Sequence, residues 1–425
     1  FRRPTPVEFA PASSCAITLL YAQQRFCAIL KIDEKRVMEP NELREQRMIG
    51  ERTLAAVLRA AGSSRPYTLS RPLELMELDL DPPGSGEVLV EIRAAGICHS
   101  DLSVLDGSRR RPAPMVLGHE AAGIVVRTGP GVTRLQAGDH VVAVFVPACR
   151  HCSDCGGGRP ALCGPANRAN GEGTLLSGQR RLRIGVESIH HHCGISGFAQ
   201  FAVMSENSLV PIDRSMPFDV AALLGCAVLT GVGAVMNTAR VTPGQHVAIV
   251  GLGGVGMAAV LGARAAGAAS IIAIDTMPDK LAQASKLGAP APLSTHSPDV
   301  VGAVREATRG GVDVALDMSG SVRALETAWQ ITRRGGKTVS CGLPDPKHLF
   351  SFSATQLVAE ERILQGSYMG GGDPAIDIPK YVDWYQEGRL PVAGLISARL
   401  PLAQINEGMD ALAAGSALRQ IIVFQ

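Results

Sequence analysis

Aromatic side chains, charged side chains and long apolar runs are all scarce in this sequence of 425 residues. Aromatic residues make up 4% and charged residues 19%, and the formal net charge is only +2. Such a chain lacks the basic surface that attracts nucleic acid or an anionic membrane, and it lacks aromatics on which bases could stack. No uninterrupted apolar run approaches the roughly 20 residues that cross a bilayer. We therefore expect neither nucleic acid nor a membrane as partner.

The length and the hydrophobic content of 46% predict a globular protein of two domains. The early apolar patches, 16–21 and 26–32, are too short and too interrupted for a secretory signal. Four of the ten cysteines fall in one short cluster, which favours metal ligation in a reducing compartment over disulfides. We expect a cytoplasmic protein. Residues 1–47 show no clear periodicity and are interpreted as an extension of uncertain order, read from upstream of a start at Met48.

Three separated stretches each offer one ligand for a metal ion. They contain Cys98, His119 and Cys226, and two of these are followed by a carboxylate, Asp101 or Glu120. Two thiolates and an imidazole form the ligand set of a catalytic zinc, whose fourth position stays open for water or substrate. Neighbouring carboxylates commonly orient such ligands or balance the charge of the ion. Each stretch alone is weak, because single buried cysteines and histidines are usually structural.

A four-cysteine cluster follows, and its spacing is more specific. Two residues separate each of the first three cysteines, and seven precede the last. This pattern predicts a closed structural zinc site that stabilises a lobe with little apolar content of its own. The expected ligands are Cys149, Cys152, Cys155 and Cys163.

The first half of the chain has the pattern of short strands separated by Gly and Pro turns. It predicts a compact, antiparallel, partly barrel-like domain with strands over 54–58, 73–78, 87–93, 118–128, 140–145 and 201–204. The polar, Gly-rich segment 167–185 is interpreted as a surface excursion without a regular element. Consecutive residues of a strand point to opposite faces, so we expect His190, His191 and His192 to be structural and not metal ligands.

The second half alternates strands with helices. A strand over 245–250 leads into Gly251-Leu252-Gly253-Gly254-Val255-Gly256, then a helix over 257–266 and a strand that ends at Asp275. A glycine turn between strand and helix, with an acid after the next strand, is the fingerprint of a dinucleotide site. The glycines let the backbone approach the pyrophosphate. An acid at that point favours the ribose hydroxyls of NAD and repels the 2′-phosphate of NADP.

Further alternation predicts a doubly wound, six-stranded parallel sheet. It consists of helices over 278–287, 298–308 and 322–333 and strands over 312–318, 337–343 and 362–367. The tail has helices over 376–388 and 402–414 and a strand over 420–424, and we expect it to return to the first domain.

With these motifs in this order, residues 53–425 resemble the zinc-dependent alcohol dehydrogenases of the medium-chain dehydrogenase/reductase superfamily. The resemblance implies an α/β fold with a GroES-like catalytic domain over 48–227 and 369–425, including a zinc lobe at about 149–163. A Rossmann domain over 228–368 would bind NAD. The implied enzyme carries two zinc ions and transfers a hydride between an alcohol and NAD. The segment 167–200 resembles the long loop of the liver-like and class III-like branches, which implies a homodimer.

The resemblance also implies roles for single residues. Ser100 would bind the hydroxyl of the alcohol, Phe145 would line the substrate pocket and Thr230 would contact the nicotinamide. The remaining cofactor contacts would come from His99, Lys280 and Arg419. In many members a His stands five residues after the first cysteine ligand as the end of a proton relay, but this chain has Ser103 there. The resemblance therefore does not assign the residue through which the proton leaves.

Two alternatives remain. One is a class III-like dehydrogenase that oxidises the S-(hydroxymethyl)glutathione adduct of formaldehyde. The loop arginines 109, 110, 111 and 168 could attract a carboxylate-bearing substrate, although charge runs usually form solvated surface. The other alternative is a non-catalytic relative that binds zinc and nucleotide structurally.

Overall fold

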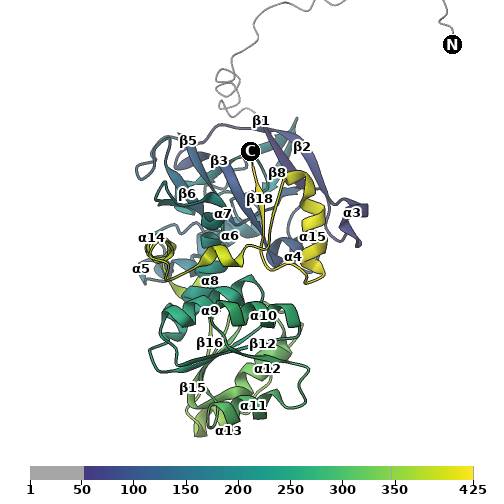
Figure 1. Cartoon of the computed structure of the whole chain (residues 1–425). Helices are drawn as coiled ribbons and strands as arrows, with labels where there is room; N and C mark the ends of the chain where they lie inside the picture. The colour runs from purple at the N-terminus through teal and green to yellow at the C-terminus, as the bar shows by residue number, and fades with distance from the viewer. Residues whose placement is uncertain (1–51, 346, 425) are drawn as a thin grey trace, which may run out of the picture. The chain divides into compact units, whose positions relative to one another are not determined.

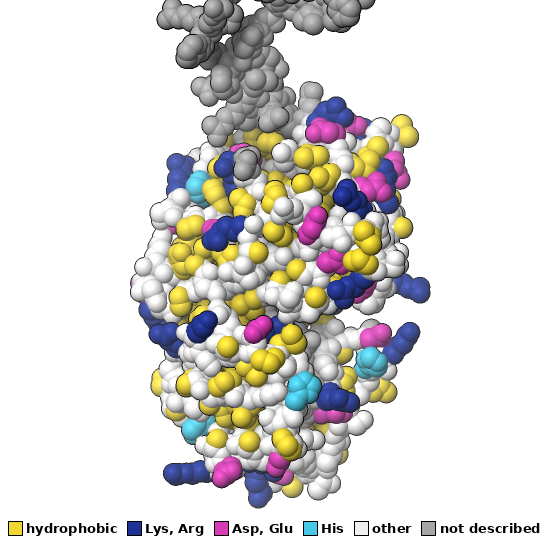
Figure 2. Space-filling view, turned by 45° about the vertical axis from the view of Figure 1, so that its right-hand side comes forward, with side chains coloured by type: hydrophobic (Ala, Val, Ile, Leu, Met, Phe, Trp, Pro, Cys, Tyr) yellow, Lys and Arg dark blue, Asp and Glu magenta, His cyan; other side chains and the backbone are white. Residues whose placement is uncertain are grey.

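The computed structural model describes residues 52–345 and 347–424. The interpretation of residues 1–47 and Met48 lies outside these residues. In the space-filling view of Figure 2, charged side chains of both signs are scattered, without a broad surface of one sign.

Two β-sheets build the catalytic part of the chain (Figure 1). The first is a closed barrel in the order β1-β2-β7-β8-β4, and the second runs β10-β6-β5-β3-β18-β17, with β9 also pairing with β3. The bounds in the first sheet are β1 (Arg52–Leu58), β2 (Leu73–Leu80), β7 (Leu182–Ile184), β8 (Glu187–His191) and β4 (Met115–Val116). Those in the second are β10 (Leu209–Ile212), β6 (His140–Ala143), β5 (Ala121–Thr128), β3 (Glu87–Ile97), β18 (Gln420–Val423), β17 (Ala398–Leu400) and β9 (Phe201–Ser205).

The third sheet has six strands, all parallel, in the order β13-β12-β11-β14-β15-β16. Its strands are β11 (His246–Val250), β12 (Ser270–Asp275), β13 (Ala291–Ser294), β14 (Val312–Asp317), β15 (Thr332–Ser340) and β16 (Ile363–Gly366). Its helices are α9 (Gly254–Ala265), α10 (Pro278–Leu287), α11 (Val300–Ala307), α12 (Val322–Ile331) and α13 (Ala354–Ala359). The predicted doubly wound parallel sheet is confirmed, but its edge strand β13 was not among the strands predicted from the sequence.

Side chains of β11 alternate between the two faces of this sheet. Val247 and Ile249 pack in the cluster with Met257 of α9, whereas Ala248 and Val250 pack with Val304 of α11. Because helices cover both faces, the strand is apolar from Val247 to Val250, which is typical of parallel sheets. The carboxyl ends of β11, β12 and β14 therefore meet at one edge, where such sheets bind ligands.

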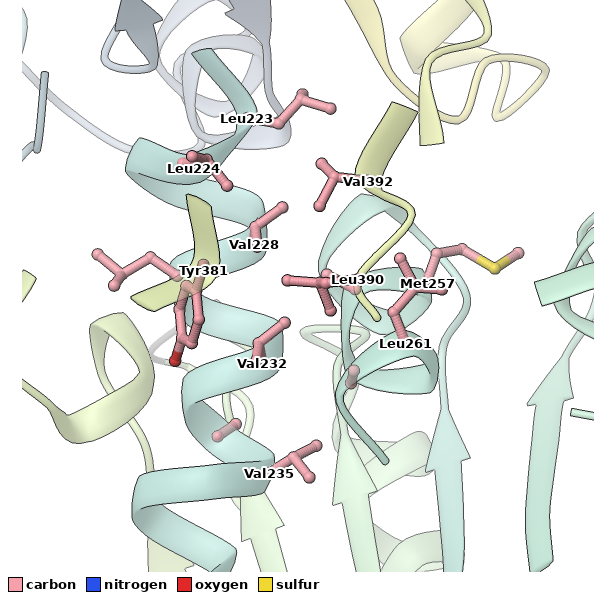
Figure 3. Close-up of a cluster of buried hydrophobic side chains, with 14 of the residues drawn as sticks. Leu223, Leu224, Val228, Val232, Val235, Met257, Leu261, Tyr381, Leu390 and Val392 are labelled. Atoms are coloured by element: carbon pink, nitrogen blue, oxygen red, sulfur yellow. The ribbon is translucent and has the colours of Figure 1, made fainter. Parts of the chain in front are cut away.

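A continuous helical run, Phe218–Ala239, links the catalytic sheets to the parallel sheet. It comprises α7 (Phe218–Leu223), the π-helical turns η3 (Leu224–Val228) and η4 (Ala234–Ala239), and α8 (Leu229–Gly233). Its length and mean hydropathy of 2.0 would allow a membrane span, but 83% of its most apolar window is buried inside the protein. The prediction concerned uninterrupted apolar runs, and Asp219, Thr230 and Asn237 interrupt this one. In Figure 3, Val228 and Val232 of this run face Leu261 of α9 and Leu390, as in the core of a globular domain.

The tail returns to the catalytic sheets, as predicted. It forms α14 (Pro374–Gln386), α15 (Ile405–Ala413) and the last two strands. Strand β18 pairs antiparallel with β3, with Gln420 opposite Ile97, and thus places the C-terminal strand beside Cys98.

The interpretation of 167–185 as an excursion without structure is wrong. Residues Gly164–Glu172 form helix α6, which begins with a Pro in its first turn and ends at Gly173 in the left-handed conformation. Ala166, Ala169 and Asn170 are buried, and β7 follows within the same segment. The apolar face of α6 consists mainly of small residues, so the sequence shows little amphipathic signal. The remaining short elements are α3 (Tyr67–Ser70), α4 (His99–Leu105), α5 (Ser153–Gly156), η1 (Pro160–Leu162), η2 (Glu206–Ser208), η5 (Met369–Gly371), η6 (Val392–Leu395) and η7 (Leu402–Gln404).

Candidate functional site

The three predicted ligands of the first zinc meet at one point. Cys98 lies between β3 and α4, His119 precedes β5, and Cys226 lies on the π-helical turn η3. Their ligand atoms and a carboxylate oxygen of Glu120 all lie within 4.8 Å of one another. Gly118 permits this approach, because its φ is +89° and a Cβ there would lie 2.6 Å from the backbone nitrogen of Phe198.

The spacing of these atoms fits a tetrahedral zinc. A sulfur at about 2.3 Å and a nitrogen at about 2.0–2.1 Å from the ion lie about 3.5 Å apart at the tetrahedral angle. The distance between Cys226 Sγ and His119 Nε2 is 3.5 Å. All three side chains are buried, which protects the site from competing ligands. These residues could therefore hold a zinc ion.

Asp101 organises this cluster through its contacts with Cys98, Gly118 and His119. Its Oδ1 lies 3.0 Å from His119 Nδ1 and accepts a hydrogen bond of 3.0 Å from the N–H of Gly118. Its Oδ2 accepts from the N–H of Cys98 at 3.1 Å. Burial alone would raise the pKa of Asp101, but the facing His119 and His192 outweigh it and lower the pKa to about 2. The ionised carboxylate thus fixes the His119 ring with Nε2 toward the cluster, as is common for zinc-ligating histidines.

Glu120 and Arg419 form a second buried pair beside the cluster. Arg419 Nη1 donates to Glu120 Oε2 at 3.0 Å and to the carbonyl of Ile97 at 3.2 Å. Burial raises the pKa of Glu120 to about 7, although the charge of Arg419 opposes this shift. Arg419 Nε is buried without a hydrogen-bond partner among the described residues. That N–H group lies against Gly254, where a Cβ would overlap it.

The four-cysteine lobe brings its sulfur atoms together as well. The sulfurs of Cys149, Cys152, Cys155 and Cys163 all lie within 4.8 Å of one another. Cys152 Sγ and Cys163 Sγ are 3.9 Å apart, close to the separation of roughly 3.8 Å between two sulfurs on a tetrahedral zinc. The N–H of Cys149 donates to Cys163 Sγ at 3.2 Å. Such a donor favours the thiolate form that a metal requires.

The glycine turn lies at the carboxyl end of β11 and opens helix α9. Gly251 has a φ of +91°, and a Cβ at Gly256 would overlap the carbonyl oxygen of Gly251. A Cβ at Gly253 would meet nothing within 4 Å, so this backbone is open to a ligand. Together with the free Arg419 N–H beside Gly254, the turn fits the pyrophosphate of a dinucleotide.

A cavity of about 470 Å³ adjoins this turn. Gly251, Asp275, Thr276 and Ser319 line it. Asp275 Oδ2 accepts from the N–H of Leu252 at 2.6 Å and Oδ1 from the N–H of Met277 at 2.9 Å. The carboxylate therefore ties β12 to the glycine turn and faces the cavity where a ribose would bind.

A second cavity, of about 120 Å³, adjoins the first metal cluster. Cys98, His119 and Cys226 line it, and so does Val255 of the glycine turn. A ligand in this cavity can thus meet the metal ligands and the dinucleotide turn together. The predicted residues Ser100, Phe145 and Thr230 also line it.

Comparisons with known proteins agree with this arrangement. Residues 84–214 match the family described as "Alcohol dehydrogenase GroES-like domain", and residues 254–387 match "Zinc-binding dehydrogenase". An S-(hydroxymethyl)glutathione dehydrogenase of Paracoccus denitrificans is 36% identical over 383 residues, which cover 88% of this chain and 100% of that protein. The chain belongs to the zinc-dependent alcohol dehydrogenases.

Solved structures extend this finding to the fold. The crystal structure of benzyl alcohol dehydrogenase from Acinetobacter calcoaceticus matches with a TM-score of 0.82 at 34% identity, over 88% of this chain and 99% of that one. An alcohol dehydrogenase zinc-binding domain protein from Burkholderia ambifaria matches with a TM-score of 0.83 at 37% identity, again over 88% and 99%. The predicted GroES-like and Rossmann fold and the predicted NAD-dependent zinc enzyme class are confirmed, and the non-catalytic alternative is set aside.

Several residues of the dehydrogenase cavity were not predicted. Asn167 and Asn170 of α6, His192, Cys193 and Tyr368 all line it. The asparagines were assigned to a surface excursion, His192 was predicted to be structural, and no sequence motif marks Cys193 or Tyr368. Their positions depend on how α6 and the segment after β8 fold against the metal cluster.

His190, His191 and His192 were all predicted to be structural, and the contacts of the first two fit this prediction. His190 Nδ1 lies 2.9 Å from the carbonyl of Pro114, and His191 Nε2 accepts from the N–H of Arg181 at 3.1 Å. Burial lowers the pKa of His191 to about 3, which keeps it neutral. His192 differs, because it lines the cavity and its Nδ1 lies 3.0 Å from Asp101 Oδ1.

Three predicted residues lie apart from the cavities. Ser103 Oγ donates to the carbonyl of His99 at 2.8 Å, so the helix backbone occupies this hydroxyl. His99 is exposed. Neither His99 nor Lys280 lines either cavity. Both remain candidates only for the rim of the dinucleotide site.

Proposed function

We propose that the enzyme oxidises a small primary alcohol, or reduces the aldehyde, in the cavity of about 120 Å³. The observation that carries this proposal is the shared lining: Cys98, His119 and Cys226 line the same cavity as Val255 of the dinucleotide turn. A substrate there is within reach of both the metal and the nicotinamide. Reacting groups held side by side need no further diffusion, which removes much of the entropic barrier.

We assign the following roles to the residues. Cys98, His119 and Cys226 hold one zinc, Asp101 orients His119, and Glu120 balances charge with Arg419. When bound, zinc supplies Lewis-acid stabilisation of a developing negative oxygen, and NAD accepts the hydride. Ser100 accepts the hydroxyl proton of the substrate at its Oγ. Phe145 and Thr230 confine the substrate, and the described Cys₄ set holds the second zinc.

Proton exit does not need Ser103 in this proposal. Its hydroxyl already donates to the carbonyl of His99. Ser100 is half-buried and lines the cavity, so its proton can pass directly to solvent.

NAD is preferred to NADP because of Asp275. Its carboxylate faces the cavity of about 470 Å³ and is fixed by two backbone N–H groups. It accepts hydrogen bonds from ribose hydroxyls and repels a 2′-phosphate. Asp275→Asn should narrow the preference for NAD, measured as the ratio of kcat/KM for the two cofactors. Wild-type enzyme that prefers NADP would contradict the assignment.

The test of the activity is NADH formation with a panel of primary alcohols, with and without a zinc chelator. We expect absorbance at 340 nm to rise with several alcohols and to be lost after chelation. The proposal is contradicted if no alcohol gives NADH and if NADH is not consumed with any of the corresponding aldehydes.

The class III-like reaction is the second candidate, favoured by the name of the Paracoccus denitrificans relative. Formaldehyde with glutathione should then be a better substrate than any plain primary alcohol. Equal or lower kcat/KM for the adduct removes this candidate.

We also propose a cytoplasmic homodimer. All eight described cysteines are free thiols, which suits a reducing compartment. The parallel sheet ends at β16, and exposed apolar side chains lie on and near this edge, among them Leu349, Val358 and Ile363. An unprotected edge strand of this kind is a template for pairing with a second chain.

The domain division that we propose, 48–227 with 369–425 and 228–368, is supported by the separate sheets.

Light scattering tests the proposed dimer. It should give the dimer mass, and Ile363→Lys should shift this mass toward that of the monomer. Ile376→Lys, at an exposed position of α14, is the control. A monomeric wild-type enzyme overturns the dimer.

A further inference from the structure

The cavity beside the metal cluster has an uncompensated positive charge. Two arginines line it, Arg109 and Arg111, whereas no Asp or Glu does so among the described residues. Two cysteine thiolates neutralise the two charges of a bound zinc. The charge of the arginines therefore remains to be met by a ligand.

In the loop of residues 109–111, only some of the arginine side chains reach the cavity. Arg109 and Arg111 are half-buried and line the cavity, whereas Arg110 between them is exposed and does not. The N–H of Arg109 donates to the carbonyl of Ser103 at 2.7 Å and thus fixes the loop to α4. Arg168, the fourth arginine considered from the sequence, is exposed and does not line the cavity.

Neither cavity arginine has a carboxylate partner in the described part of the chain. Arg111 Nε is buried without any hydrogen-bond partner there. Two other half-buried arginines have carboxylate partners: Arg181 Nε donates to Glu87 at 2.7 Å, and Arg183 binds Asp81. A buried donor without a partner costs about 1–3 kcal/mol, and more when it is charged. A ligand that supplies an acceptor recovers this cost.

We propose that the substrate is an alcohol that carries a carboxylate, which Arg109 and Arg111 bind while its hydroxyl faces the metal cluster. This inference rests on the proposed alcohol oxidation. A guanidinium offers a planar fork of donors that matches the two oxygens of a carboxylate. One water needs roughly 10–15 Å³ of such space, so the cavity holds on the order of ten waters and suits a substrate of similar size.

The test compares 5-hydroxypentanoate with 1-pentanol, which lacks the carboxylate. Wild-type holoenzyme should show at least a tenfold higher kcat/KM for 5-hydroxypentanoate, and the preference should shrink as salt screens the charge. Arg111→Met should lower that preference at least tenfold, mainly through KM. Arg110→Met, on the same loop but outside the cavity, should keep it within twofold. No preference in the wild type, or equal losses in both variants, overturns the proposal.

Calorimetric binding separates this inference from the activity itself. Zinc-loaded enzyme should bind 5-hydroxypentanoate at least tenfold more tightly than Arg111→Met does, even if no NADH forms. Equal binding refutes the anion site whatever the activity. If the glutathione adduct of formaldehyde is used more than tenfold better than 5-hydroxypentanoate, the assignment to a small carboxylate substrate is wrong.

Discussion

Arg419 and Glu120 join the metal cluster to the dinucleotide turn. Arg419 Nη1 donates to Glu120 Oε2 at 3.0 Å, and Arg419 Nε lies against Gly254. Replacing Arg419 with Met leaves a buried carboxylate without its partner. We expect a loss of about 3–5 kcal/mol in the free energy of unfolding, which is usual for breaking a buried pair. Urea unfolding measures the loss, and a change below 1 kcal/mol would contradict the pairing. Arg389→Met, at an exposed ion pair, is the control.

Two glycines of the same turn should respond differently to Ala. Gly256→Ala places a Cβ against the carbonyl of Gly251, so it should lower the thermal midpoint of the protein. Gly253→Ala meets no protein atom, so it should leave the midpoint unchanged and weaken NAD binding. We expect roughly a tenfold increase in the Kd of NAD, because the backbone can no longer approach the pyrophosphate. Equal thermal midpoints for the two variants would falsify this distinction.

Ser100 and Ser103 form a matched pair for the proton step. Ser100→Ala removes the hydroxyl that lines the cavity and should lower kcat about 10²-fold or more, the usual contribution of a positioned proton acceptor. Ser103→Ala removes only a bond to the backbone of its own helix and should change kcat less than threefold. Steady-state kinetics between pH 6 and 10 compare them. A large loss of kcat in Ser103→Ala would instead support a proton relay through Ser103.

The two zinc sites should differ in what their loss does. Cys98→Ser should remove one zinc per chain and abolish activity while the fold is kept, because sheets pack around this site without the metal. Cys155→Ser should remove the other zinc and lower the thermal midpoint, because the lobe around α5 has few apolar side chains to hold it. Atomic emission gives the zinc count, and circular dichroism gives the midpoint. If Cys155→Ser keeps both zinc ions, the Cys₄ assignment is wrong.

Asp410 of α15 should give local stability that depends on pH. It accepts hydrogen bonds from the N–H groups of Tyr67 at 2.8 Å and Thr68 at 2.9 Å. Partial burial favours a higher pKa, but these donors and Arg65 outweigh it and hold the pKa of Asp410 below its usual value. A lowered pKa gives stability that is present above the unfolded value of about 3.9 and is lost as pH falls through the folded value.

The measurement is amide hydrogen exchange at Tyr67 and Thr68. Asp410→Asn should weaken protection near pH 6 by about 1 kcal/mol, the usual size of a helix cap. The difference from wild type should shrink below pH 4. Glu407→Gln, at an exposed position of the same helix, is the control. A difference that is constant with pH points to packing instead of charge.

Local patterns were enough to predict the parallel sheet and the glycine turn. The strand-turn-helix sequence around Gly251 encodes its own geometry, because the chirality of parallel connections leaves few alternatives. The cavity lining was less predictable. His192 and Asn170 reach it only because α6 and the segment after β8 pack against the metal cluster, and such contacts leave no periodic signal. Arg109 and Arg111 were noticed as charges, but their separation from Arg110 depends on the folded loop.

The pairing of β18 with β3 has a consequence for synthesis on the ribosome. Strand β3 leads directly to Cys98, yet its neighbour β18 is made only when residues 420–423 are translated. All six strands of the parallel sheet precede residue 367 and can assemble earlier. The nascent catalytic half must therefore wait with an unfilled sheet position until residues 420–423 have been made.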